Sequence, residues 1–231
     1  MDNTINFLTG PALYVSLGVF FIGLTVRFVL YFMGLSWKLE RVAYKADMAH
    51  GLKGGAYSAF KWLIPFGTHG WRSQPYLTVA FFLLHFGVVL VPLFLAGHNV
   101  IIKEAFGFSL PSMPQWLADG LTLMAMGGIV MLALRRIALP EVRILTSLYD
   151  WFILLLVFVP FFSGFMAATH AGNYQLWLIC HIVSGELLLI LAPFTKLSHI
   201  ALYFASRVQI GMDFAIKRGG HSRKGGAFFP W

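Results

Sequence analysis

Five stretches of mainly apolar residues constrain this chain more than any other feature of its sequence. A helix needs roughly 20 apolar residues to cross the hydrocarbon core of a bilayer. Apolar residues occur all round these stretches rather than on one stripe, which is typical of membrane spans. We therefore predict an all-α integral membrane protein, a bundle of five transmembrane helices over residues 11–34, 75–97, 116–134, 148–169 and 175–203.

The composition excludes several other classes of protein. Hydrophobic residues make up 58% of the chain and charged residues only 11%, whereas soluble domains carry about 25% charged residues. One cysteine excludes a disulfide framework and any cysteine-ligated zinc site or Fe–S cluster built by this chain alone. The first span is no cleaved signal peptide, because it lacks a basic start and its apolar run is too long.

The distribution of lysine and arginine predicts the orientation. These residues concentrate in 36–73, in 135–143 and after residue 206, whereas the opposite side carries only Lys103. Basic loops stay in the cytoplasm, so the N-terminus is expected outside and the C-terminus in the cytoplasm, in the cell inner (cytoplasmic) membrane. This topology also accounts for the net charge of +8, and we expect the lipid bilayer, and no nucleic acid, as a partner.

Two cytoplasmic segments complete the predicted organisation. We predict one membrane domain over residues 1–206 and a basic tail over residues 207–231. Residues 37–53 mix bulky apolar and charged side chains, which is typical of a helix lying on the membrane surface. The Gly-rich tail ends in aromatic residues, and it either touches lipid or docks into a cytoplasmic subunit.

Four histidines lie in or beside the second and fifth predicted spans. His85 lies mid-span, and His98 follows 13 residues later at the outer end. His181 lies near the outer start of the fifth span, and His199 follows 18 residues later near its inner end. On one continuous helix, 18 residues make five full turns over about 27 Å, so His181 and His199 are expected to point the same way.

Because the two spans run antiparallel, the histidines fall at two levels. His98 and His181 lie at the outer level, and His85 and His199 lie nearer the cytoplasm. Two histidines at each level would provide axial ligands for two haems held between facing helices. Covalent attachment needs two cysteines before the histidine, so both haems would be b-type.

Other interpretations of the histidines stay open at this point. The histidines could relay protons in a proton-coupled transporter, or could serve as packing residues of a non-haem membrane anchor. The spacings on the two helices differ by about 7.5 Å along the axis. His170, at the outer end of the fourth span, is an alternative outer ligand to His98.

Three segments carry a resemblance to a known family. They are residues 18–27, which end in Arg27, residues 134–150, which run from Leu-Arg-Arg to Asp150, and residues 178–200. The last segment holds both histidines and a Pro-Phe-Thr-Lys-Leu approach to the second. These segments resemble the cytochrome b (gamma) subunit of respiratory nitrate reductase and the membrane cytochromes b of sulfate-reducer complexes: the high-molecular-weight cytochrome c complex, its tetrahaem-cytochrome counterpart and the Dsr complex.

The resemblance implies two haem b groups held by crossed pairs, His85 with His199 and His98 with His181. It matches His98 less closely, because the family's spacing to that ligand is shorter than 13 residues. The family's nitrate reductase subunit has a lysine entering the third helix near the outer haem, where this chain has only Asp119. This difference leaves a menaquinone site undetermined.

Three further ionisable residues within the spans are candidates for a functional role. Lys196 is a candidate partner for a propionate of the inner haem. Arg27 is a second such candidate, and the alternative is that its side chain extends to the membrane interface. Glu186 could pair with an interior group or relay protons.

The predicted function is electron transfer by a di-haem subunit of a respiratory redox complex. The aromatic, Gly-rich tail differs from the end of the nitrate reductase subunit, which favours the relatives in sulfate respiration. Electrons would pass between the quinone pool, or a periplasmic multihaem cytochrome c, and a cytoplasmic Fe–S partner. The sequence leaves open whether such a subunit acts as a quinone oxidoreductase, alone or with other membrane subunits.

Overall fold

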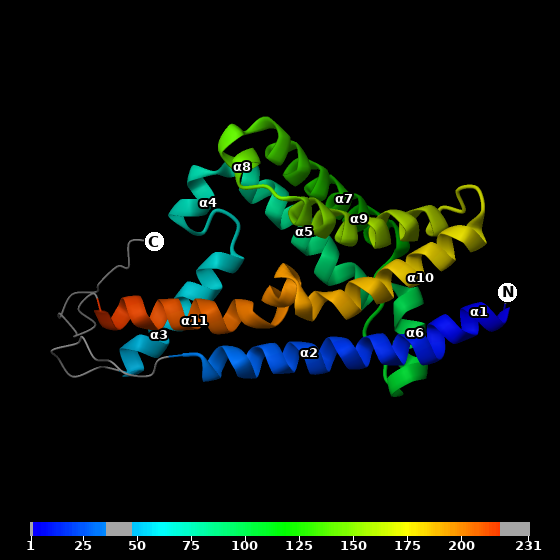
Figure 1. Ribbon diagram of the computed structural model, residues 1–231, viewed down its shortest axis with the longest axis horizontal. Helices are drawn as coiled ribbons and strands as arrows, with labels where there is room; N and C mark the ends of the chain where they lie inside the picture. Colours follow the sequence, from blue (N-terminus) through cyan, green and yellow to red (C-terminus); the bar gives the residue numbers. More distant parts are fainter. Residues whose placement is uncertain (1, 36–47, 218–231) are drawn as a thin grey trace. The chain divides into compact units, whose positions relative to one another are not determined.

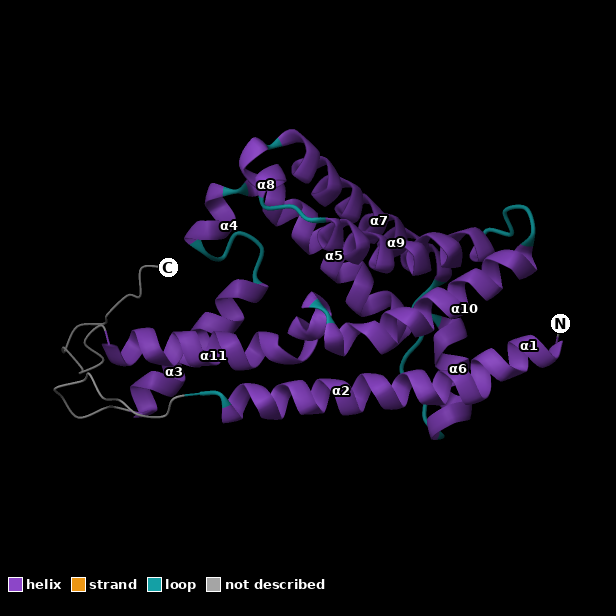
Figure 2. Cartoon of the chain, in the orientation of Figure 1, coloured by secondary structure: helices purple, strands orange, loops and turns teal. Residues whose placement is uncertain are grey.

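The computed structural model describes residues 2–35 and 48–217, and these residues form helices joined by short turns, with no strand among them (Figures 1 and 2). In chain order the elements are α1 Asp2–Phe7, the π-helix η1 Leu8–Ala12, α2 Leu13–Met33, α3 Met48–Leu63, α4 His69–Ser73, α5 Pro75–Phe94, α6 Ala96–Phe106, α7 Gln115–Ala138, α8 Pro140–Ile144, α9 Leu148–Ala168, α10 Tyr174–Leu191, the 3-10 helices η2 Ala192–Phe194 and η3 Lys196–Ser198, and α11 His199–Lys217.

Five helical stretches are long and apolar enough to cross a membrane, which confirms the predicted all-α membrane fold. They are Asn3–Met33, Pro75–Phe94, Gln115–Ala138, Leu148–Ala168 and Tyr174–Phe194. Large apolar side chains cover their outer surfaces, as Phe86, Leu134 and Leu155 show. Such a surface suits lipid, and the protein is therefore a multi-pass membrane protein embedded in a bilayer.

Four of these stretches differ from the predicted spans by three residues or more. The first starts earlier, at Asn3, and widens into η1 around Pro11, which has no N–H for the regular helical bond. The second ends at Phe94, because Leu95 is extended. The third ends at Ala138, four residues later than predicted. The fifth ends near Phe194: Pro193 interrupts the helix and Thr195 is extended. His181 and His199 therefore do not lie on one continuous helix.

The chain divides into two compact units, Met1–Phe20 with Tyr76–Thr195 and Phe21–Pro75 with Lys196–Trp231. In the first unit α9 packs against α10 and α7, and η1 packs against α10. α5 and α7 approach closely at Gly87 and Gly128. A Cβ at Gly87 would collide with the carbonyl of Leu121, and one at Gly128 would lie 2.7 Å from the carbonyl oxygen of Ala80. Small residues permit the same close approach in other membrane helix pairs.

In the second unit α3 and α11 lie side by side (Figure 1). Gly54 and Gly55 face the α11 backbone, and the Tyr203 hydroxyl donates to the carbonyl of Ala59 at 3.2 Å. The Tyr31 hydroxyl of α2 donates to Gln209 of α11. α11 continues to Lys217. The predicted surface helix over residues 37–53 lies mostly outside the described residues, as does the tail after Lys217.

Candidate functional site

The structure brings His98 and His181 together within the first unit. Their ring centroids are 5.8 Å apart, and the ring planes are within 4° of parallel. His98 is the third residue of α6 and His181 is the eighth residue of α10. Two imidazoles from separate helices, at this spacing, form the candidate site.

The end of α5 positions the His98 side chain. A helix leaves its last carbonyls without partners from its own backbone, and Leu95 breaks α5 so that these carbonyls bond elsewhere. The carbonyl of Phe94 accepts from the Met113 amide at 2.8 Å, and the carbonyl of Pro92 lies 3.2 Å from Nδ1 of His98. The chain thus turns back over the end of its own span and directs His98 by a hydrogen bond.

Asn99 fixes α6 from the other side. This residue is buried, with 4% of its surface exposed. Its amide nitrogen donates to the Ser112 hydroxyl at 3.0 Å, and its amide oxygen accepts from the Leu110 amide at 3.3 Å. These two bonds tie the loop over residues 107–114 to the residue next to His98.

α9 holds His181. Nδ1 of His181 lies 2.8 Å from the carbonyl oxygen of Pro160. The ring lies directly over Gly164, where a Cβ would be 2.8 Å from Nδ1 and 2.9 Å from Cε1. A glycine at this position is therefore required for the ring to occupy its place.

The separation of the two ring centroids matches the separation expected of two imidazoles bound to one metal ion. Bonds from imidazole to metal are about 2 Å long, and each nitrogen is about 1 Å from its ring centre, so two ligands of one metal have centroids about 6 Å apart. A carbonyl oxygen can only accept, so Nδ1 carries the proton in both rings and Nε2 holds the lone pair that binds metal. Ligand histidines commonly make such a bond. Burial, and secondarily His181, lower the pKa of His98, which favours the neutral form that binds metal.

The two predicted inner ligands are held in the same way, each in a different unit. Nδ1 of His85 lies 2.7 Å from the Phe81 carbonyl oxygen, and the His85 ring stacks on Phe81 at 3.8 Å between centroids. Nδ1 of His199 lies 2.9 Å from the Lys196 carbonyl oxygen. His199 is the exposed first residue of α11, directly after the helix break. The pairing of His85 with His199 stays a prediction.

Of the other predicted residues, Lys196 and Arg27 belong to the second unit, and His170 and Glu186 belong to the first. Lys196 is exposed in η3, and Arg27 is exposed on α2. The exposed ring of His170 packs against Tyr174, at 5.0 Å between centroids. Glu186 lies on α10, and its Oε1 is buried without a hydrogen-bond partner among the described residues.

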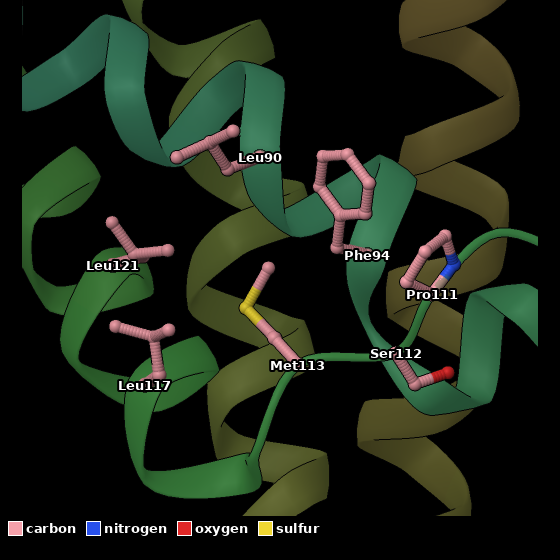
Figure 3. Close-up of a pocket in the computed structure, with 7 residues that line it drawn as sticks. All are labelled: Leu90, Phe94, Pro111, Ser112, Met113, Leu117 and Leu121. Atoms are coloured by element: carbon pink, nitrogen blue, oxygen red, sulfur yellow. The ribbon is translucent and has the colours of Figure 1, made fainter.

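An apolar hollow of about 300 Å³ lies in the first unit, between α5, α7 and the loop that Asn99 holds. Figure 3 shows the side chains that line it. The side chains of Leu90, Phe94 and Met113 line it, together with Pro111, Ser112, Leu117 and Leu121. Ser112 lines this hollow, and its hydroxyl also accepts the hydrogen bond from the Asn99 amide. An apolar molecule could occupy it.

Sequence reasoning did not identify Gly164, Asn99 or the carbonyls of Pro92 and Pro160 as parts of the site. A proline within an apolar span is a signal for Pro92, because the helix after it is prone to bend. Gly164 gives no such signal, since its role depends on a contact with another helix. Among residues 2–35 and 48–217 no group of three or more His, Cys, Asp or Glu side chains could hold a metal ion, so a two-histidine site is the candidate.

Comparison with known proteins gives one close relative. The chain is 63% identical over 225 residues to a curated protein of Nitratidesulfovibrio vulgaris strain Hildenborough, whose description reads only "Protein". The match covers 97% of this chain and 99% of the relative. No family model matches the chain, and no solved structure matches it significantly. The chain therefore belongs to the same family as this Nitratidesulfovibrio vulgaris protein.

Proposed function

We propose that this protein is a di-haem b electron-transfer subunit of a respiratory complex in the inner membrane, with its N-terminus outside and its C-terminus in the cytoplasm. The spacing and parallel planes of His98 and His181 are the observation that carries the proposal. A haem bound between them would exchange single electrons between ferric and ferrous iron.

The residues of this chain hold and orient the two ligands. The carbonyls of Pro92 and Pro160 keep each Nδ1 protonated and each ring in its rotamer. A hydrogen bond of this kind also makes the coordinating nitrogen more basic. Gly164 lets the His181 ring pack against α9, and this contact covers one side of the ring and excludes water there.

The second haem would lie at the inner level, with His85 and His199 as its ligands. Both rings hold Nδ1 against a backbone carbonyl, as the outer pair does, which supports the same role. Lys196 and Arg27 are the cations we assign to haem propionates, since a buried carboxylate requires a positive partner.

Electrons would enter or leave at both membrane surfaces. We assign the outer end to menaquinone or to a periplasmic multihaem cytochrome c, and the inner end to a cytoplasmic Fe–S subunit, with other membrane subunits able to join the complex. The apolar hollow beside α5 and α7 is large enough for part of a quinone. An apolar hollow with few polar groups is typical of sites for such lipid-soluble cofactors.

A proton-coupled transporter or a non-haem anchor is the second candidate. The buried Oε1 of Glu186, which has no hydrogen-bond partner among the residues that the structure describes, favours the transporter, because intramembrane carboxylates often serve proton relays. This alternative predicts a protein without haem, whose proton movement depends on Glu186.

A reduced-minus-oxidised visible spectrum of the purified chain distinguishes the two functions. We expect a b-type spectrum and two haems per chain. His98→Ala should then hold one haem, whereas the matched variant His170→Ala, which changes an exposed ring, should hold two. A chain without a b-type spectrum excludes the electron-transfer function, and two haems in His98→Ala refute the ligand assignment.

A further inference from the structure

The helix α3 carries its large apolar side chains outward and its small ones inward. Gly54, Gly55, Ser58 and Ala59 are buried on one face. The opposite face exposes Leu52 at 57%, Phe60 at 66% and Leu63 at 45% of their surfaces, followed by Ile64 and Phe66 after the helix. A helix on the surface of a water-soluble protein shows the reverse pattern.

The packing against α11 prevents α3 from turning this face inward. A Cβ at Gly55 would lie 2.9 Å from the carbonyl oxygen of Val208, and one at Gly54 would lie 2.5 Å from the Cβ of Ala215. Only residues without large side chains fit at this distance. The apolar face over residues 52–64 must therefore stay on the outside of the second unit.

Basic residues flank this face, and no acidic residue accompanies them. Residues 48–75 contain Lys53, Lys61 and Arg72 and neither Asp nor Glu. Lys53 follows Leu52 on the exposed side of the helix, and the Lys61 ammonium lies 5.6 Å from the ring centroid of Tyr57. Lysine and tyrosine beside apolar residues are typical of helices at a membrane interface.

The position of α3 in the chain favours lipid as the occupant of this face. α3 lies between the consecutive membrane stretches Asn3–Met33 and Pro75–Phe94, so both ends of its segment start from the same membrane surface. A helix of 16 residues is about 24 Å long, which is short enough to lie along that surface beside the spans.

We propose that α3 lies in the headgroup layer of the bilayer, with Leu52, Phe60 and Leu63 among the acyl chains and Lys53 and Lys61 on the headgroups of anionic phospholipids. This interface anchors the packed pair of helices α3 and α11 to the membrane surface. The proposal needs membrane insertion only, so it stands whether or not the chain binds haem.

Spin labels on the full chain in vesicles test the depth of the face. Cys180 is the one cysteine, so labels are placed in a Cys180→Ser background at Leu52→Cys, Phe60→Cys and Leu63→Cys. Lys61→Cys, at the flank of the same helix, is the matched control. We expect labels on the face to collide with oxygen more often than with a water-soluble nickel complex, and the label at the flank to show the reverse.

Two results would overturn the proposal. If the nickel complex reaches all four labels equally, the face lies in water. If neither reagent reaches the face labels, a protein surface covers them, either a second copy or another partner. Circular dichroism of each variant confirms that the helices form.

The lipid composition of the vesicles tests the contribution of the lysine charges to membrane binding. A lysine near an anionic surface favours binding by about fivefold, so the oxygen-to-nickel collision ratio at Phe60→Cys should rise when phosphatidylglycerol is added to phosphatidylcholine vesicles. High salt should reverse the rise, because screening weakens exposed charges. The added substitutions Lys53→Gln and Lys61→Gln should abolish it. An unchanged response in that variant contradicts the role of the lysines.

Discussion

The contact between Gly164 and His181 gives the sharpest mutational prediction. In Gly164→Ala the new Cβ would lie 2.8 Å from Nδ1 of His181, whereas ordinary contact begins at 3.4 Å. The ring must therefore move by about 0.6 Å or the two helices must separate. A ligand displaced by more than about 0.5 Å no longer holds productive geometry.

The expected size of the effect follows from the cost of overpacking. Inserting a methyl group into a filled site costs about 1–3 kcal/mol, which corresponds to haem binding at the outer site weaker by about 5- to 150-fold. Pro160 lies on the same helix as Gly164, so movement of the ring away from α9 would also lengthen the bond from Nδ1 to the Pro160 carbonyl. The inner haem should keep its affinity, since the nearest atoms to the new Cβ all belong to His181.

Redox titration of the purified variants measures this effect. The wild type should titrate as two components, and Gly164→Ala should lose or shift one of them. Gly127→Ala is the matched control, because a Cβ at Gly127 meets no atom within 4 Å. Two unchanged components in Gly164→Ala would refute the assignment of His181 as a ligand in this geometry.

Three further variants test the contacts within each unit. Asn99→Ala removes the bond to Ser112 and should destabilise α6 by about 1–3 kcal/mol, seen as earlier loss of the outer haem on heating; equal haem loss in variant and wild type would count against this role. Gly54→Ala introduces a Cβ against the α11 backbone and should cost about 1–3 kcal/mol, seen as faster hydrogen exchange in α3, while unchanged exchange would mean that the helices do not pack so closely. Arg207→Ala removes a guanidinium that lies 3.7 Å from the Trp62 ring centroid, a contact worth about 0.5–2 kcal/mol. It should also speed hydrogen exchange in α3, and an unchanged rate would mean that the contact adds nothing to stability.

The membrane spans were predictable because length and apolar composition are local properties. The starts and ends of the spans depended on prolines whose effect varies with their surroundings. Pro92 lies inside α5 without ending the helix, and the helix ends three residues later at the extended residue Leu95. Pro193 lies where the fifth stretch does end. Counting residues along an ideal helix was therefore wrong for His181 and His199.

The histidines of the candidate site could be predicted from the sequence, but the residues that position them could not. His98 approaches His181 because the chain turns after α5, and no spacing on a straight helix gives that direction. Gly164 and Asn99 act through atoms of other segments, so their roles appear only when the helices are packed. The pattern of α3 shows the same limit, since its inward face is recognisable only from its contact with α11.

Low-temperature electron paramagnetic resonance of the oxidised, purified chain tests the central claim most directly. Axial imidazoles with parallel planes give ferric haem a rhombic low-spin spectrum, whereas perpendicular planes give one dominated by a single low-field feature. The 4° between the rings of His98 and His181 predicts a rhombic low-spin component that is lost in His98→Ala and kept in His170→Ala. A spectrum with high-spin haem only, or with no haem, would contradict the account.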